Sequence, residues 1–290
     1  MNINFNYKKI FLFSLIFVDY PFCCYSYVLP QTFREWTPIG INNQIDKTKP
    51  YFFNLGNMPM LLWYNKNQVP NVMINTCKHL GNSLSDSYID KNNCLICPYH
   101  KTAYNENDNM GSTVINNQDG LIWWSYKSYT KTPFKFSSVC YNDYYNSYID
   151  VNVDIISCVL NLIADFNYDT YKTSRHGMKF LFKDKKNNRL LFLYPYTIII
   201  KNGDYYYKYG ISPIGVYNSR IFISSNNKKG FDNYLNLEKK TNFFPFKLRM
   251  AFTNDNKKKA EEQIFNLYMN KYMIIDDNTI HHFLMNRKYY

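Results

Sequence analysis

Two short stretches of this sequence each pair one cysteine with one histidine: Cys77–Ser85, which reads CKHLGNSLS, and Cys97–His100, which reads CPYH. Seventeen residues separate His79 from Cys97. Each stretch can therefore supply one thiolate and one imidazole from a single loop. Two such loops folded against each other would present two sulfur and two nitrogen ligands to a metal centre.

This donor set suits two kinds of centre. In a Rieske [2Fe–2S] cluster, two His replace two Cys on one of the irons, so each loop gives one ligand to each iron. A structural zinc site also uses two Cys and two His, but it usually pairs like with like, as C-x2–4-C and H-x3–5-H. The mixed pairs, Gly81 after His79 and Pro98 in the second loop favour the cluster. Zinc remains the alternative.

The sequence around the ligands resembles the Rieske domain of ring-hydroxylating and related oxygenases. The first ligand stretch is similar to the family's C-x-H-x-G-x-x-L-S. Four other segments carry the resemblance: Trp36–Gly40, Tyr51–Gly56, Met60–Trp63 and Gly120–Trp124. After His100 the chain reads KTAY over Lys101–Tyr104, where the family usually has G-W-x-F, so Lys101 replaces a glycine. The resemblance implies an all-β sandwich that holds the cluster.

The branch of the family follows from two residues that are not cysteine. Rieske proteins of respiratory and photosynthetic complexes carry an extra Cys in each ligand loop, and these two form a disulfide. The matching positions here are Asn82 and Tyr99. The chain therefore resembles the oxygenase and soluble-ferredoxin branch, and within it the pheophorbide a oxygenase-like enzymes. The other five cysteines show no disulfide-scaffold spacing.

The second half of the chain has a different pattern. Apolar residues recur with a helical period over residues 155–166, and three or four strands are expected within 178–224, with Pro195 breaking the run 190–200. A basic amphipathic helix is expected over about 255–269. This order resembles the helix-grip catalytic domain of Rieske oxygenases, so the predicted fold class is α+β. The predicted domains are a leader (1–27), a Rieske domain (28–136), a linker (137–150) and an oxygenase-like domain (151–290).

In the family, this second domain binds a mononuclear iron through two His and one carboxylate. Its motif N-x-x-x-D-x-x-H-x-x-x-x-H is matched at the start by Asn161 and Asp165, but Tyr168 stands at the first His position. By resemblance, Asp165 bridges the Rieske His of one subunit to the iron site of the next in a homotrimer. Alternatively, Asp165 is only a helix-terminal residue.

The remaining iron ligands match the family weakly. His176 lies three residues beyond the second His position, and Asp277, four residues before His281, is a candidate carboxylate near the chain end. Tyr168 is itself a candidate ligand, because phenolate oxygen can bind iron. An exposed polar cluster near a terminus is the alternative interpretation of Asp277.

Two functions therefore remain open. The first is a Rieske oxygenase that takes electrons from a ferredoxin or a flavin/NAD(P)H reductase, with a [2Fe–2S] cluster and an Fe(II) that activates O2 on an apolar small molecule. The second is a non-catalytic electron-transfer or redox protein whose second domain has lost its iron. The missing His favours the second function, whereas Asn161, Asp165 and the two-domain length favour the first.

The net charge and the apolar N-terminal segment bear on which partners and which location the protein has. The net charge of +12 comes partly from short lysine clusters, such as Lys183–Lys186 and Lys257–Lys259, which are either solvated loops or a dock for an acidic electron donor. No nucleic-acid motif is present. Residues 10–18 form an apolar run after Lys8 and Lys9, so we expect a targeting leader, with a membrane-surface anchor or a buried strand as the alternatives, and the localisation is left open.

Overall fold

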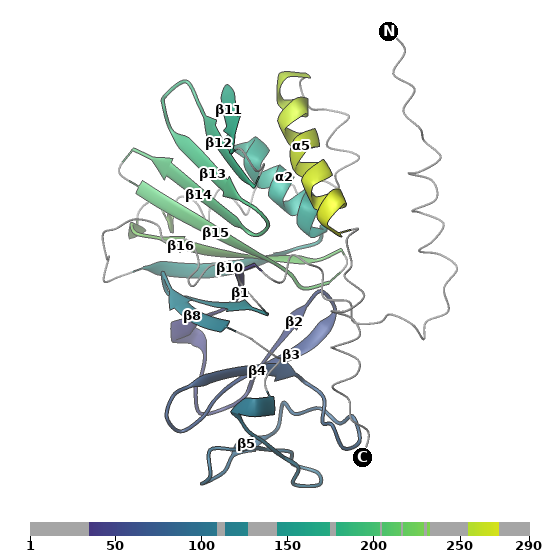
Figure 1. The fold of residues 1–290 in the computed structure, drawn as a ribbon. Helices are drawn as coiled ribbons and strands as arrows, with labels where there is room; N and C mark the ends of the chain where they lie inside the picture. Colours follow the sequence, from purple (N-terminus) through teal and green to yellow (C-terminus); the bar gives the residue numbers. More distant parts are fainter. Residues whose placement is uncertain are drawn as a thin grey trace, which may run out of the picture.

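A computed structural model of the chain describes residues 35–108, 114–126, 144–174, 178–203, 205–215, 217–228, 231–232 and 255–272. The predicted leader, His176 and Asp277 lie outside these ranges. The described residues form two stacked parts (Figure 1). The N-terminal part is built from small sheets, and the C-terminal part is one large sheet covered by two helices. This confirms the α+β fold class.

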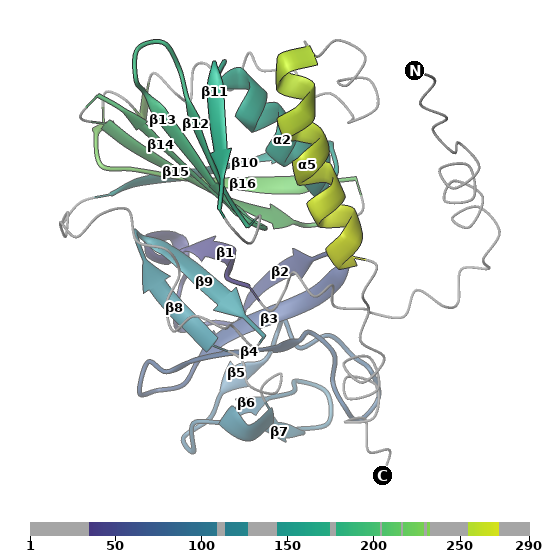
Figure 2. The same ribbon diagram turned by 45° about the horizontal axis from the view of Figure 1, so that its top comes forward.

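The N-terminal part contains three antiparallel sheets of three strands each. The first has the order β1–β9–β8, and the second and third run in chain order as β2–β3–β4 and β5–β6–β7. Their bounds are β1 Thr37–Ile41, β2 Tyr51–Leu55, β3 Met58–Tyr64, β4 Pro70–Ile74, β5 Tyr88–Ile89, β6 Leu95–Ile96, β7 Ala103–Tyr104, β8 Val114–Gln118 and β9 Leu121–Ser125, with 3-10 turns at Asn42–Gln44 and Glu106–Asp108. The β5–β7 sheet lies at the end of the molecule remote from the C-terminal sheet (Figures 1 and 2).

The C-terminal part is a seven-stranded antiparallel sheet in the order β10–β16–β15–β14–β13–β12–β11. Its strands are β10 Tyr145–Val151, β11 Thr170–Thr173, β12 Lys179–Lys183, β13 Arg189–Leu193, β14 Thr197–Asn202, β15 Tyr205–Pro213 and β16 Ser219–Ser225. Consecutive strands from β11 to β16 are neighbours, so short turns suffice to connect them. The expected break at Pro195 falls between β13 and β14.

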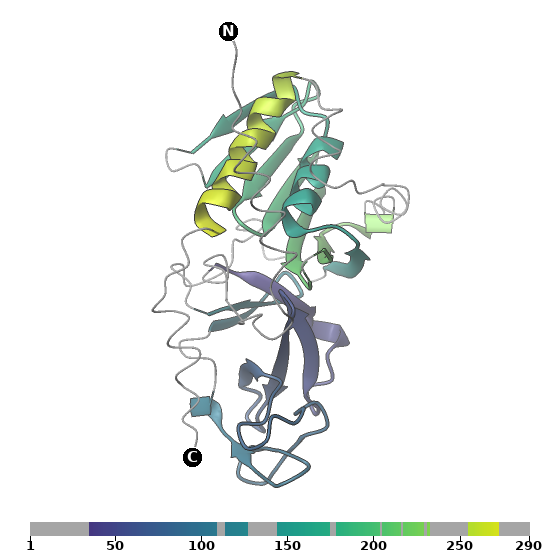
Figure 3. The ribbon, with the colours of Figure 1, turned by 90° about the vertical axis from the view of Figure 1, so that its right-hand side faces the viewer.

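Two helices, α2 (Ile155–Asp165) and α5 (Asp255–Tyr272), cover the same face of this sheet (Figure 3). Asp154 caps α2, because its Oδ1 accepts hydrogen bonds from the backbone N–H groups of Ile156 and Ser157. Buried residues on α5 include Ala260 and Ile264, so its inner face joins the core although the helix is basic overall. None of the described helices is long and apolar enough to cross a membrane.

Two strands were not expected from the sequence. β10 pairs with β16 and so occupies the end of the predicted linker 137–150, and β11 pairs with β12. Both are edge strands with mostly polar or exposed residues. Few side chains of these edge strands are buried, so their sequences lack the alternation of apolar and polar residues that marks the inner strands. The domain boundaries themselves stay predictions.

One hydrophobic core runs through both parts of the molecule. It joins Leu62 and Trp124 of the N-terminal sheets to Val159 of α2 and Ile221 of β16. Gly210 of β15 permits this close approach, since a Cβ there would come within 2.8 Å of both Pro38 and Trp123. The two parts are therefore packed directly against each other.

A buried ion pair crosses the same boundary. Lys208 Nζ on β15 lies 2.8 Å from Asp119 Oδ2 in the turn between β8 and β9, and neither side chain is more than 7% exposed. The ammonium also lies 4.5 Å from the centroid of the Trp123 ring, and Ser224 Oγ donates to the Asp119 carbonyl. Burial lowers the pKa of Lys208, while Asp119 opposes that shift. The charge of Lys208 thus depends on its partner.

We expect Asp119→Asn to destabilise the protein by about 3–5 kcal/mol, because it leaves a buried ammonium without its counter-charge. Asparagine suits the left-handed backbone at this position (φ 57°), so the loss of charge is the main change. The measurement is urea unfolding followed by tryptophan fluorescence. All four tryptophans (Trp36, Trp63, Trp123 and Trp124) lie in the N-terminal part.

The control is Asp150→Asn, which breaks the more exposed pair with Arg220 and should cost about 1 kcal/mol or less. Adding Lys208→Met to Asp119→Asn should restore most of the lost stability, because no buried charge then remains. Equal costs for Asp119→Asn and Asp150→Asn would contradict the assignment.

Candidate iron-sulfur centre

The four predicted cluster ligands come together on two loops at the remote end of the N-terminal part. Cys77 and His79 lie on the loop from β4 to β5, and Cys97 and His100 on the loop from β6 to β7. Both cysteines are buried, whereas both histidines are exposed. The two imidazole rings meet edge to face with their centroids 4.8 Å apart. The structure therefore brings all four residues to one place, with sulfur inside and nitrogen at the surface.

The two loops share one backbone pattern. The N–H of Cys77 donates to the carbonyl of Asn82 at 2.7 Å, and the N–H of Cys97 donates to that of Thr102 at 2.9 Å. In return, Gly81 and Lys101 donate to the carbonyls of Cys77 and Cys97 at 2.8 and 3.2 Å. Each ligand pair is thus held in a loop that closes on its own cysteine. The repetition of one loop explains why each supplies one Cys and one His.

The closing residue of each loop adopts a left-handed backbone. Gly81 has φ +75°, and Lys101, at the equivalent position, has φ +60°. A glycine adopts this conformation freely, whereas a residue with a Cβ is strained there by about 1–2 kcal/mol. The departure from the family pattern at Lys101 therefore has a structural cost. The Lys101 ammonium donates to the carbonyl of Pro98 at 3.3 Å and lies over the Tyr88 ring. These two contacts offset part of the backbone strain.

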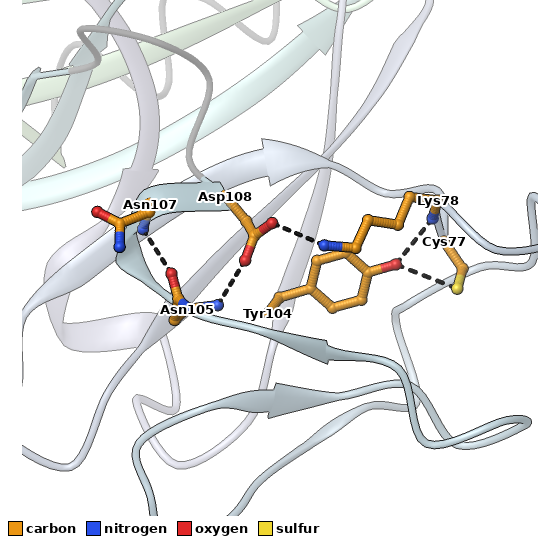
Figure 4. A network of polar contacts seen from close by, with 6 residues as sticks. All are labelled: Cys77, Lys78, Tyr104, Asn105, Asn107 and Asp108. Carbon is orange, nitrogen blue, oxygen red and sulfur yellow. Dashed lines mark hydrogen bonds and ion pairs between the residues drawn. The ribbon is translucent and has the colours of Figure 1, made fainter. Parts of the chain in front are cut away.

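A tyrosine contributes a contact to the site that the sequence did not indicate. Tyr104 Oη donates to Cys77 Sγ at 3.1 Å and accepts from the Lys78 N–H at 2.7 Å (Figure 4). Burial raises the pKa of Cys77, but hydrogen bonds from Tyr104 and from the His79 backbone outweigh it and hold that pKa at about 7. Burial and the bond to Cys77 raise the pKa of Tyr104. Cys77 is thus readily deprotonated for iron binding, while Tyr104 stays a donor.

A buried asparagine ties down the far side of the first loop. Asn75 Oδ1 accepts from the Leu84 N–H at 2.8 Å, and its Nδ2 donates to Ser85 Oγ at 2.9 Å. The loop from Cys77 to Ser83 is therefore closed at its base by one side chain. The only sequence signal for Asn75 was its place just after a buried strand, two residues before the ligand.

The arrangement fits a two-iron cluster. Thiolates are the ligands of iron–sulfur clusters, and two imidazoles replace two of them in Rieske centres. Leu61, Trp63, Met73, Leu84 and Leu95 form one hydrophobic cluster with both cysteines. Such a lining excludes water from the sulfur side, and solvent access and polarity around a metal site control its redox potential. Cys94 is partly exposed and hydrogen-bonds to a loop carbonyl instead.

The residues predicted to bind a mononuclear iron form a less complete set than the cluster ligands. Tyr168 is 3% exposed, donates a hydrogen bond to the carbonyl of Lys257 at 3.1 Å and packs against Phe182 with ring centroids 4.6 Å apart. Asn161 is buried, and its Nδ2 donates to the Ser157 carbonyl, while Asp165 at the end of α2 is exposed. His176 and Asp277 lie outside the described residues. Within the described ranges, no three His, Cys, Asp or Glu side chains gather to hold a single metal ion.

Comparison with known proteins agrees with the geometry. Residues 35–120 match the family model of the Rieske [2Fe-2S] domain, which favours the cluster over zinc. A search of curated proteins found no match.

Solved structures with a similar fold include dicamba monooxygenase bound to 3,6-dichlorosalicylic acid. That chain is 12% identical, the alignment covers 85% of this chain and 99% of that one, and the TM-score is 0.61. NdmB of Pseudomonas putida CBB5 is 14% identical, with 81% and 82% covered and a TM-score of 0.53. At these identities the likeness establishes the fold. The pheophorbide a oxygenase-like branch stays a prediction.

We expect Lys101→Gly to stabilise the N-terminal part by about 1 kcal/mol, because it removes the left-handed strain at the closing position of the second loop. The readout is the urea midpoint of tryptophan fluorescence. Lys66→Gly is the matched control: Lys66 is also an exposed turn lysine but lacks a positive φ, so glycine there should lower the midpoint. A lower midpoint for both variants would show that the strain at Lys101 is fully compensated.

Proposed function

We propose that this chain, which carries a Rieske [2Fe-2S] domain at residues 35–120, is an oxidoreductase of the Rieske oxygenase type. The observation that carries the proposal is the pair of equivalent loops that bury Cys77 and Cys97 and expose His79 and His100. The cluster, when bound, supplies one-electron transfer. Its electrons would come from a ferredoxin or a flavin/NAD(P)H reductase, as the resemblance implies.

The exposed histidines define where electrons enter and leave. Leu80 and Tyr99, next to His79 and His100, are 63% and 57% exposed, so an apolar rim surrounds the imidazole rings. Residues 75–108 contain three lysines and four acidic residues, which gives a local charge of −1. The lysine clusters considered for donor docking, 183–186 and 257–259, belong to the C-terminal part. Contact at the cluster end would therefore rest on apolar packing more than on a basic surface.

The finer proposal assigns oxygenase chemistry to the C-terminal part. Asp165 would bridge the cluster of one subunit to the second domain of another, and His176, Asp277 and Tyr168 are the candidate iron ligands. The ligand loops lie at the opposite end from α2 and the seven-stranded sheet (Figures 1 and 3), so transfer to that sheet favours an assembly of several chains, such as a homotrimer. The substrates would be O2 and an apolar small molecule.

The hydrogen bond of Tyr168 favours the second candidate function. Its hydroxyl is engaged by the Lys257 carbonyl within an aromatic cluster, which gives this side chain a structural role. Of the three candidate iron ligands, only Tyr168 is among the described residues, and it does not present a free oxygen. A non-catalytic electron-transfer protein with the oxygenase fold is the alternative.

Iron and sulfide analysis of the anaerobically purified protein separates the two functions. An oxygenase should contain three irons and two acid-labile sulfides per chain and should take up O2 with a reduced donor. An electron carrier should contain two irons and two sulfides and show no O2 uptake. A protein without labile sulfide would contradict both.

Tyr168→His extends this test. If the natural chain holds two irons and its pocket survives, the new imidazole should allow a third iron to bind, because it restores the family ligand. Tyr171→His is the control, since it places the same side chain on the neighbouring strand β11 away from the motif position. A third iron in both variants would indicate nonspecific binding by the introduced histidine.

A further inference from the structure

We propose that the outer face of strands β11–β14 docks on an anionic phospholipid membrane. The outer face is the side of the seven-stranded sheet opposite to α2 and α5 (Figure 3). The inference goes beyond the proposed function, because it requires neither a bound cluster nor an iron in the C-terminal part.

Strands β11–β14 carry five positively charged residues and no acidic one. The five cations are Lys172, Lys179, Lys183, Arg189 and Lys201. The register pairs Lys183 with Arg189 and Arg189 with Lys201, so these three side chains point to the same side of the sheet. Lys179 lies four residues before Lys183, and Lys172 pairs with the residue midway between those two, so both share that side. All the positive charge of these strands therefore lies on one face.

That face is the one turned away from the helices. Phe180, Phe182 and Ile198 occupy positions that alternate with the cations, and they belong to the core cluster that contains Val159 of α2 and Ile264 of α5. The cations must then point outward. Four of them are exposed and one is half-buried, so solvent reaches the charged groups.

An apolar centre lies between the cations. Leu181, Leu191 and Ile199 form a continuous row across β12, β13 and β14. Leu193 and Ile199 form a small hydrophobic cluster, with Leu191 and Tyr206 packed against it, that is separate from the core beneath the helices. A sheet face that meets only water usually carries polar residues at such positions. The outer face instead joins an apolar centre to a basic rim, the combination that binds membrane surfaces.

The N-terminal part covers the other half of the same face. Lys208 of β15 continues the row of Ile199, and Gly210 of the same strand packs against Trp123. In that covered half the buried ammonium of Lys208 has Asp119 as its counter-charge. In the part of the chain that the structure describes, none of the five cations of β11–β14 has a carboxylate partner. The half formed by β11–β14 therefore matches a partner that carries negative charge.

The kind of cation favours a fluid surface as that partner. Four of the five are lysines, whose flexible ammonium groups act as point charges, whereas a defined phosphate or carboxylate site more often uses the fixed fork of arginine. Lys183, Arg189 and Lys201 lie on adjacent strands, which are spaced about 4.8 Å apart. Their separation is thus below the Debye length of about 8 Å at physiological salt, so their fields add.

Other anionic partners match the face less well. Leucine and isoleucine side chains do not stack on bases, so the apolar centre does not suit single-stranded nucleic acid. An acidic electron donor bound here would lie at the end of the molecule opposite to the ligand loops of the same chain (Figure 1). An anionic membrane uses both the charges and the apolar centre.

The experiment measures the partition of the purified full chain onto lipid vesicles by co-sedimentation. Phosphatidylcholine vesicles that contain about 30% phosphatidylserine should bind the protein at least about tenfold better than phosphatidylcholine alone, because the anionic surface attracts the basic face. Raising the salt to about 1 M should remove the difference, since the Debye length then falls to about 3 Å.

The test variant combines Lys179→Gln with Lys201→Gln and removes two exposed charges from the face. We expect its partition onto anionic vesicles to fall about 25-fold, or about fivefold for each charge lost near the membrane surface. The control combines Lys66→Gln with Lys91→Gln, two exposed turn lysines of the N-terminal part, and should change the partition little. All variants keep the apolar run at residues 10–18, so that segment cannot cause a difference between them.

Three outcomes would overturn the inference. The first is a natural chain that binds anionic vesicles no better than neutral ones. The second is an equal change in the test and control variants, which would show an effect of net charge alone. The third is binding to an oligonucleotide, lost in the test variant, without binding to vesicles, which would assign the face to nucleic acid. None of these measurements depends on the iron or sulfide content, so the proposed function is tested separately.

Discussion

Each ligand loop has to bury a thiol and expose an imidazole within two or three residues. The chain solves this twice with the same pair of backbone hydrogen bonds, which close the loop on the N–H and the carbonyl of its own cysteine. Because both polar groups of the cysteine backbone are satisfied locally, the sulfur can lie in an apolar environment without leaving a buried group unpaired. The exposure of His79 and His100 beside two buried thiols depends on this closure.

The ligand loops are also held by side chains that are not ligands. Asn75 closes the base of the first loop, and Tyr104 joins that loop to the strand after the second. In metal sites generally, groups around the ligands orient them and adjust the properties of the metal. The ion pair between Lys78 and Asp108 is at the surface and should contribute little free energy by itself. It joins the residue after Cys77 to the turn that follows β7.

The two parts of the molecule differ in how completely they match a Rieske oxygenase. The N-terminal part brings the four predicted ligands together and buries both cysteines. In the C-terminal part, the residue at the predicted first iron-ligand position is a core tyrosine, Tyr168, whose hydroxyl donates to a carbonyl of α5. The shared core and the buried pair of Lys208 with Asp119 fix these parts against each other. A function for the C-terminal part therefore has to be compatible with predicted ligand loops that lie at the other end of the molecule.

The sequence by itself predicted the α+β class and most inner elements, including α2, α5 and the break at Pro195, because local spacing and apolar period carry that information. It also predicted the four cluster ligands, which the fold brings together and which stay a prediction. The edge strands β10 and β11 could not be predicted from the sequence. Few of their side chains are buried, so apolar and polar residues do not alternate along them. Only the tertiary structure decided that Tyr104 contacts Cys77, 27 residues away, and that Lys208 pairs with Asp119, 89 residues away. Such contacts join positions that chain packing alone brings together, and no short motif can record them.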